Sequence, residues 1–159
     1  MDYTLRENEI MEDSERKQVV VFELADEEYA VDITQSKQII KVSKITPVPN
    51  PPAYVRGVIN LRGQIVPVVD LRKRFGINSG TGEKERIITI EYEDMLIGLL
   101  VDDIKEVLWY DTEKELESAP EIDTAVRQDY IKGVIKKGKR LIVLIDLEKL
   151  LFENRPVSA

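Results

Sequence analysis

The sequence predicts an all-β protein built from two small barrels of five strands each, and three observations predict it. Residues 54–76 align without a gap to residues 130–152 at an offset of 76, with seven identities in 23 positions. The segments before each copy align as well, at an offset of 68: 17–26 with 85–94, and 31–40 with 99–108. Short runs rich in β-branched residues also recur at the spacing of small β domains. One architecture is therefore used twice in the chain.

The first repeat unit covers about residues 17–77, and five strands are predicted in it: Gln18–Leu24, Glu28–Ile33, Ile39–Lys44, Val58–Leu61 and Ile65–Asp70. The second unit covers about residues 85–153 and supplies the five strands that the repeat requires: Arg86–Tyr92, Met95–Val101, Glu106–Tyr110, Val134–Lys136 and Leu141–Asp146. Strands this short close easily into barrels, and closure removes exposed edges.

The last two strands of each unit are predicted to form a hairpin, with turns at Arg62-Gly63 and Lys137-Gly138. The two turn glycines differ by one alignment position, so we expect slightly different turn registers and hairpin tips that present different surfaces. Asp70 and Asp146 each follow an apolar run and precede Leu-x-Lys. An aspartate oxygen at such a place accepts a backbone N–H and starts a short helix, so both are interpreted as structural N-caps.

The C-terminal run Leu150-Leu151-Phe152 predicts a longer and better buried helix than the one expected after Asp70. Outside the repeat units, residues 1–16 are polar and read as a flexible N-terminal arm. Residues 78–84 are rich in glycine and serve as a linker, and residues 154–159 form a tail. Four prolines in the stretch 46–52 predict a stiff approach to Tyr54.

The chain of 159 residues contains neither cysteine nor histidine. This removes thiolate nucleophiles, imidazole bases and the commonest metal ligands, so we expect no enzymatic activity, no metal and no cofactor. Asp102 and Asp103 are the nearest approach to a metal or acid–base site, but adjacent strand residues point to opposite faces, and a solvated strand end is the better interpretation. The sequence contains no apolar run long enough to span a membrane and no signal peptide, so we expect a cytoplasmic protein without direct membrane insertion.

The formal net charge is −7, yet residues 54–76 carry five Lys/Arg against one Asp and residues 130–140 carry five against none. These basic strips leave open a nucleic-acid-binding double barrel as an alternative, which the overall acidity disfavours. The tip Asn60-Leu61-Arg62-Gly63 combines an amide, an apolar anchor and a planar cation. The residues by themselves indicate an interaction module with at least two surfaces.

The segment GVINLRGQIVPVVDLRKRFG within residues 54–76 closely resembles the signature of the CheW-like domain family, which includes bacterial chemotaxis coupling proteins and the regulatory domain of the histidine kinase CheA. Residues 22–40, the Pro-rich stretch, residues 97–102 and the closing LIVLIDLEKLL match as well, so the resemblance covers about 140 residues. It implies two SH3-like barrels that exchange strands. A chain of this length has no room for a kinase, so we expect an adaptor that couples methyl-accepting chemotaxis receptors to CheA and is recruited to receptor arrays through these partners.

The resemblance also implies site residues. Receptor tips are expected in a groove between the barrels, at Ser36, Gln38, Ile39, Val58, Asn60 and Arg62. The regulatory domain of CheA is expected at Leu61, Gly63, Ile97, Gly98 and Leu99, whereas Gly57 and Gly133 are expected to serve backbone geometry. Each has a plainer alternative, since Ile39 and Val58 could belong to the core. Gln38 stands where relatives often carry Glu, so a hydrogen bond would replace a charge pair, at a difference of about 0–1 kcal/mol for a surface ion pair.

Overall fold

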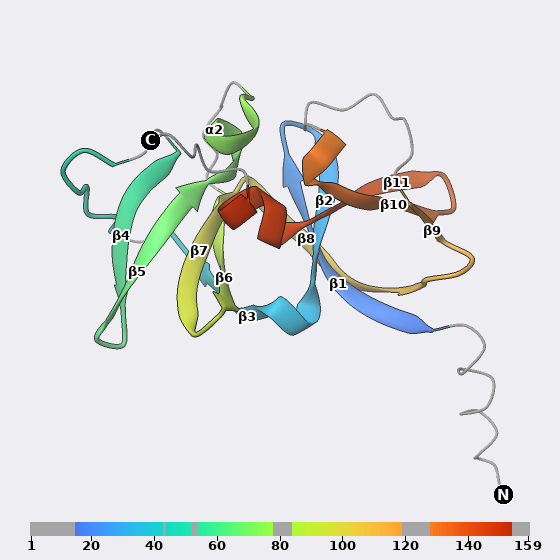
Figure 1. The fold of residues 1–159 in the computed structure, drawn as a ribbon, viewed down its shortest axis with the longest axis horizontal. Helices are drawn as coiled ribbons and strands as arrows, with labels where there is room; N and C mark the ends of the chain where they lie inside the picture. The colour runs from blue at the N-terminus through green and yellow to red at the C-terminus, as the bar shows by residue number, and fades with distance from the viewer. Residues whose placement is uncertain (1–14, 43, 52–53, 78–83, 119–127, 154–159) are drawn as a thin grey trace, which may run out of the picture.

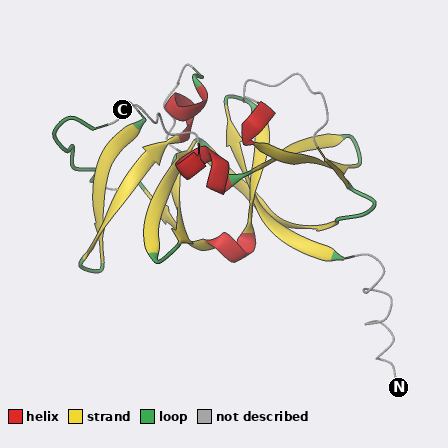
Figure 2. Ribbon diagram, in the orientation of Figure 1, coloured by secondary structure: helices red, strands yellow, loops and turns green. Residues whose placement is uncertain are grey.

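Two groups of strands lie side by side in the computed structural model, which describes residues 15–42, 44–51, 54–77, 84–118 and 128–153 (Figure 1). The strands are β1 (Arg16–Leu24), β2 (Glu27–Asp32), β3 (Ser36–Lys41), β4 (Val55–Leu61), β5 (Gln64–Asp70), β6 (Arg86–Tyr92), β7 (Met95–Val101), β8 (Asp103–Asp111), β9 (Leu116–Ser118), β10 (Ile131–Lys137) and β11 (Arg140–Ile145). Short helices are η1 (Ile33–Gln35), α2 (Leu71–Phe75), η2 (Gln128–Tyr130) and η3 (Lys149–Glu153). Figure 2 shows how far strands outweigh helices. The predicted N-terminal arm up to residue 14, most of the linker at 78–83 and the tail at 154–159 lie outside the described residues.

The two units exchange strands. One sheet has the order β3-β6-β7-β5-β4 and is called the first barrel; the other has the order β8-β1-β2-β11-β10-β9 and is called the second barrel. The hairpin β1–β2 of the first unit thus lies in the second barrel, and the hairpin β6–β7 of the second unit lies in the first. The exchanged hairpins join their hosts through parallel pairs, β5 with β7 and β2 with β11. Neither unit could form its barrel alone.

Both barrels close in the same way. In the first, Thr46 exchanges two backbone hydrogen bonds of 2.8 Å with Val58, which brings the segment after β3 against β4. In the second, β9 follows β8 and pairs with β10, placing Glu117 opposite Val134. Because Val58 and Val134 are aligned residues of the repeat, β9 is the counterpart of the Thr46 bridge. The second barrel therefore has six strands where five were predicted.

Gly57 and Gly133 lie at this closure. A Cβ on Gly57 would come within 2.3 Å of the Thr46 carbonyl oxygen, and its φ of +151° lies in the region that favours glycine. A Cβ on Gly133 would meet the Leu116 side chain at 2.8 Å and the Glu117 carbonyl oxygen at 3.0 Å. The absent side chain lets the closing segment approach β4 or β10.

The hairpin turns of the two copies occupy the same aligned position, which corrects the predicted difference in register. Leu61 pairs with Gln64 and Lys137 with Arg140, so the turns are at 62–63 and 138–139. The turn conformation differs instead: residues 62 and 63 both have positive φ, whereas in the second turn only residue 138 does. The first pattern is that of a type I′ turn and the second that of a type II′ turn, which places its glycine first. This explains why the glycine is displaced by one position.

Each barrel has its own core, and a third and larger core lies between them. Val19, Val21 and Ile142 belong to the core of the second barrel, and Ile59 and Val66 belong to that of the first. The core between the barrels collects side chains from both, among them Val20, Phe22, Tyr29, Ile88, Leu99 and Tyr130. Strand β1 buries both of its faces, because its alternate residues serve two cores. We therefore expect the barrels to unfold as one unit.

The two copies meet around Arg74. Its guanidinium carbon lies 4.9 Å from the ring centroid of Tyr54 and 4.8 Å from that of Tyr130. Its Nη2 and Nε donate to the Leu150 carbonyl oxygen at 2.9 and 3.2 Å. Tyr54 aligns with Tyr130 and Arg74 with Leu150, so the contact joins equivalent positions of the repeat. The Arg74 hydrogen bonds therefore link α2 to the C-terminal helix.

The aspartates that follow β5 and β11 have N-cap geometry. Asp70 Oδ1 accepts from the backbone N–H groups of Arg72 and Lys73 at 3.1 and 3.3 Å. Asp146 Oδ1 accepts from the Lys149 N–H at 3.1 Å. Helical structure follows each aspartate, at α2 and at residues 147–153. The C-terminal stretch is the longer of the two.

Candidate functional site

The residues expected to contact a receptor lie on the two terminal strands of the first barrel. Ser36, Gln38 and Ile39 belong to β3, and Val58 and Asn60 belong to β4. These strands are the outermost of the sheet order, and the segment that follows β3 pairs with β4 at Thr46 and Val58. Closure places Gln38 of β3 in one hollow with Leu61 and Arg62 at the end of β4.

Gln38, Leu61 and Arg62 line one hollow of about 400 Å³ at the mouth of the first barrel. The β6–β7 hairpin forms its other wall, and two lining residues, Lys37 and Glu91, form an ion pair at 2.9 Å. The Gln38 backbone carbonyl accepts from the Thr89 hydroxyl at 3.2 Å. The exchanged hairpin of the second unit thus completes a site that begins in the first unit.

The Asn60 side chain orders the hairpin tip. Its Oδ1 accepts from the Gly63 N–H at 2.8 Å, and Arg62 between them has a φ of +55°. A non-glycine residue in this region is uncommon and costs conformational energy, so the tip is held by the surrounding turn. Arg62 is exposed at the end of the hairpin. The tip therefore presents Arg62 from an ordered turn.

Ile39, Val58 and Asn60 face the outside of the barrel. Ile39 is 40% exposed, and Asn60 lies opposite Ile65, which is 60% exposed. Val58 is half-buried and lies opposite the exposed Pro67. The receptor candidates thus divide into two groups: Gln38 and Arg62 at the mouth of the barrel, and Ile39, Val58 and Asn60 on its outer wall. Ser36 is half-buried at the start of β3, opposite Ile90.

Three of the residues expected to contact the kinase are not on the surface. Ile97 is 6% exposed and Leu99 is fully buried in the core between the barrels. Gly98 is buried, and a Cβ there would meet Ile87 at 2.8 Å. Strand β7 is also hydrogen-bonded on both sides, by β6 and β5. This placement removes the three residues from the candidate contact surface and leaves Leu61 and Gly63 at the hairpin tip.

Sequence reasoning missed a polar junction between the barrels, and the prediction of a solvated strand end is wrong for Asp102. Its Oδ1 pairs with the guanidinium of Arg72, whose side chain is only 6% exposed. Its Oδ2 accepts a hydrogen bond from the Ala25 N–H at 2.8 Å. The Asp102 N–H donates to the Glu23 carbonyl at 3.1 Å. One carboxylate therefore links α2 of the first barrel to the β1–β2 turn of the second.

Two other features are absent from the part of the chain that the structure describes: a membrane-spanning helix and a cluster of metal-ligating side chains. No helix there is long and apolar enough to cross a membrane. Among the same residues, no three acidic side chains come together as a metal site.

Residues 18–154 match the sequence model of the family described as the CheW-like domain. The chain belongs to the CheW-like domain family. Among its relatives, the chemotaxis protein CheW of Bacillus subtilis is 39% identical over 90% of this chain and 92% of its own length. The chemotaxis protein CheW of Treponema pallidum is 34% identical over 86% of this chain and 82% of its own.

A solved structure agrees with this assignment. The scaffolding protein TtCheW of Thermoanaerobacter tengcongensis superposes with a TM-score of 0.79 at 39% identity, covering 87% of this chain and 94% of that one. The prediction of two SH3-like barrels with exchanged strands is confirmed. The CheW-like chain described here is a chemotaxis coupling adaptor and not an enzyme. The comparisons give the nucleic-acid-binding alternative no support.

Proposed function

We propose that this chain couples methyl-accepting chemotaxis receptors to the regulatory domain of the histidine kinase CheA, so that the receptor state controls kinase activity. The observation that carries the proposal is the gathering of β3 and β4 candidates around the closure of one barrel, next to a rigid hairpin tip. The adaptor acts in the cytoplasm and reaches receptor arrays through its partners.

The receptor is proposed to contact Gln38 and Arg62 at the mouth of the first barrel and Ile39 and Val58 on its outer wall, with Ser36 and Asn60 at the margins. The mouth offers an amide and a guanidinium, and the wall offers exposed apolar side chains. An arginine with apolar neighbours is the composition typical of an energetic centre in an interface. With Gln38, the polar contact is a hydrogen bond.

The kinase is proposed to contact the hairpin tip through Leu61 and Gly63. Both lie beside Arg62, so the two partners would approach neighbouring parts of one rigid hairpin. Each contact alone need only be micromolar, about −8 kcal/mol. Simultaneous contacts in an array raise the effective concentration of each partner.

Separate binding measurements test this division of the surface. Isothermal titration of a receptor cytoplasmic fragment should show at least about tenfold weaker binding for Arg62→Ala and Val58→Asp, as expected for loss of central interface residues. Lys139→Ala is the matched control, because it removes an exposed cation from the equivalent turn of the second barrel. Titration with the CheA regulatory domain should be unaffected by Val58→Asp and weakened by Leu61→Asp. Wild-type receptor affinity in folded Arg62→Ala and Val58→Asp variants would contradict the proposal.

A further inference from the structure

The mouths of the two barrels differ at one set of aligned positions. Three uncharged residues help to line the hollow at the mouth of the first barrel: Gln38, Gln64 and Leu96. At the repeat offsets of 68 and 76, their counterparts are three charged residues, here called the second mouth: Glu106, Arg140 and Glu28. Strand pairing agrees with the alignment. Gln38 lies opposite Thr89 in the first barrel. Glu106 lies opposite Val21, the residue aligned with Thr89, in the second.

The three charged side chains form one network across the second mouth. Arg140 Nε and Nη2 donate to the two carboxylate oxygens of Glu28 at 3.1 and 3.2 Å. Arg140 Nη1 lies 2.7 Å from Glu106 Oε2. The residues come from β11, β2 and β8, and β1 lies between β2 and β8 in the sheet order. The guanidinium therefore spans several strands, held by a bidentate pair on one side and a second carboxylate on the other.

The network lies at the end of the second-barrel core. Arg140, Glu28 and Glu106 each stand two residues before a side chain that belongs to this core or packs against it: Ile142, Ala30 and Leu108 in the same order. Alternate residues of a strand share a face, so the three charged residues are on the inward face of the barrel. Arg140 and its two partners thus cover the place that corresponds to the hollow of the first barrel.

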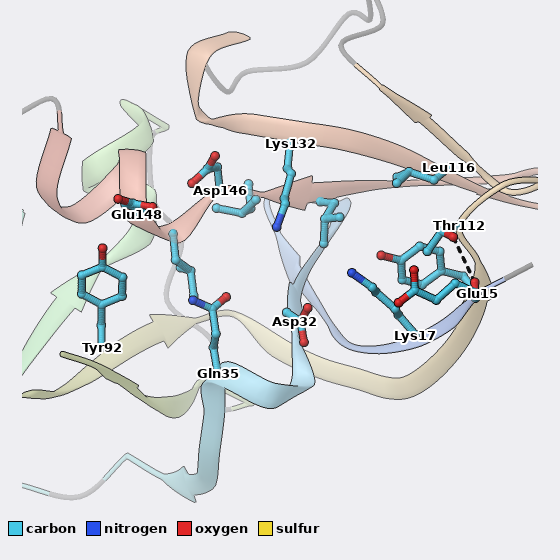
Figure 3. Close-up of a pocket in the computed structure, with 14 residues that line it drawn as sticks. Glu15, Lys17, Asp32, Gln35, Tyr92, Thr112, Leu116, Lys132, Asp146 and Glu148 are labelled. Carbon is cyan, nitrogen blue, oxygen red and sulfur yellow. Dashed lines mark hydrogen bonds between the residues drawn. The ribbon is translucent and has the colours of Figure 1, made fainter. Parts of the chain in front are cut away.

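The hollow of about 420 Å³ drawn in Figure 3 is a different place. Asp32 and Asp146 are among its lining residues. Asp32 ends β2 and Asp146 follows β11, whereas Glu28 and Arg140 lie at the beginnings of these two parallel strands. The hollow is therefore at the opposite end of the second barrel and gives no opening at the second mouth.

Outside the mouths, the two barrels present similar apolar side chains. Ile39 and its counterpart Val107 are both exposed. Ile65 and its counterpart Leu141 are exposed as well. The second barrel thus reproduces part of the apolar outer wall that is proposed above to receive the receptor. Apolar side chains alone would not tell the two barrels apart, so the difference has to come from the mouths.

The network makes the second mouth costly to enter. A side chain placed there would have to displace a guanidinium held by two carboxylates, or leave charges without their partners. An isolated exposed ion pair is weak, but a bidentate arginine in a network is held more firmly. In the first barrel the corresponding positions carry two amides and a leucine, so a partner displaces no charge from them. The Lys37–Glu91 pair beside them is a single exposed pair.

We propose that Arg140, with Glu28 and Glu106, closes the second mouth to the receptor, so that each chain binds one receptor, at its first barrel. Arg140 is then a specificity-determining residue that acts by exclusion. Gln64 and Leu96 have the complementary role, because they keep the mouth of the first barrel free of such a network. These roles rest on the receptor site proposed above.

Chemical-shift mapping on the full ¹⁵N-labelled chain tests the exclusion without a substitution. A receptor cytoplasmic fragment should shift amides at 37–38, 61–64 and 94–96 and leave those at 26–28, 105–107 and 138–141 unchanged. The opened variant Glu28→Leu/Glu106→Gln/Arg140→Gln carries the residues of the first barrel at the second mouth. In this variant the second set of amides should shift as well.

Transferring the network to the first barrel gives the converse test. The closed variant Gln38→Glu/Gln64→Arg/Leu96→Glu should bind the fragment at least about tenfold more weakly in isothermal titration, the loss typical of one hydrogen bond to a charged group. Lys139→Gln is the matched control, because it makes the same change of one negative charge at an exposed turn and should bind as the wild type does. Circular dichroism establishes that each variant is folded.

The outcomes separate this exclusion from the receptor site itself. Equal shifts at both mouths of the wild type would overturn the exclusion and leave the receptor site standing. An unchanged second set in the folded opened variant, or wild-type affinity of the folded closed variant, would do the same. No shift at the mouth of the first barrel in the wild type would contradict the receptor site, and the exclusion with it.

Discussion

Replacing Asp102 by asparagine should destabilise the protein well beyond an ordinary surface change. The side chain keeps its shape and can still accept from the Ala25 N–H, but it no longer carries the charge that compensates Arg72. Arg72 is 6% exposed at its side chain, and its Nε is buried without a hydrogen-bond partner in the described structure. The guanidinium would therefore remain buried and uncompensated.

The expected cost follows from this burial. Removing one partner of a buried ion pair costs about 3–5 kcal/mol, and the 22% exposure of the Asp102 side chain lowers the expectation to about 2–3 kcal/mol. Removing both charges, in Arg72→Met/Asp102→Asn, should cost less than Asp102→Asn alone, because no charge is then left buried. The difference between the single and double variants measures the coupling.

Urea unfolding followed by circular dichroism supplies the free energies. The matched control is Glu91→Gln, which breaks the exposed Lys37–Glu91 pair, with side chains 53% and 43% exposed, and should cost less than about 1 kcal/mol. Equal effects of Asp102→Asn and Glu91→Gln would refute the reasoning. A double variant that is less stable than Asp102→Asn would refute it as well.

Three other predictions concern the frame. Gly57→Ala should destabilise by about 3 kcal/mol or more in urea unfolding, because its Cβ would meet the Thr46 carbonyl oxygen at 2.3 Å and its φ is positive. Gly133→Ala should cost about 1–2 kcal/mol, because its Cβ would meet a Leu116 side chain that can shift and would meet backbone only at 3.0 Å. Equal costs would contradict this. Arg74→Lys should lower the free energy of unfolding by about 1–2 kcal/mol, because lysine cannot reproduce the contacts with both the Tyr54 and Tyr130 rings and the two hydrogen bonds to the Leu150 carbonyl. An unchanged thermal midpoint would argue against the contribution of these contacts. The hydrogen bond from Lys137 and then that from a backbone N–H lower the pKa of Glu115 below its ordinary 4.5. The Glu115 carboxylate therefore stabilises the fold above pH 4.5, and this contribution is lost as the pH falls through the lowered pKa. Between about pH 5.5 and pH 3, Glu115→Gln should lose less stability than the wild type. Equal losses would count against the Lys137–Glu115 hydrogen bond.

The sequence pattern located ten of the strands because each is a short apolar run between turn residues. It missed β9, which has three residues in an acid-rich segment and is defined by pairing with β10. Strand exchange came from the family resemblance, since periodicity does not say which sheet a hairpin joins. The turn register was misjudged because a type I′ and a type II′ turn place glycine at different positions of the same two-residue loop.

The candidate site was predictable in part. Gln38 and Arg62 share one hollow because the segment after β3 closes the barrel against β4, but the division of the candidates between mouth and outer wall depends on register. Ile97 and Leu99 lie in a continuous apolar run, which is typical of a strand buried on both faces, and that signal argued against a contact role. The partner of Asp102 was not predictable, because Arg72 is 30 positions away and the pairing arises from strand exchange.

Kinase activity in a reconstituted array tests the coupling function most directly. Receptor-containing vesicles and CheA would be combined with the wild-type chain, with Arg62→Ala or with the control Lys139→Ala, and phosphate transfer measured with and without attractant. The account predicts receptor-controlled kinase activity with the wild type and the control and its loss with folded Arg62→Ala. Attractant-controlled activity at the wild-type level with Arg62→Ala, or none with the wild-type chain, would contradict it.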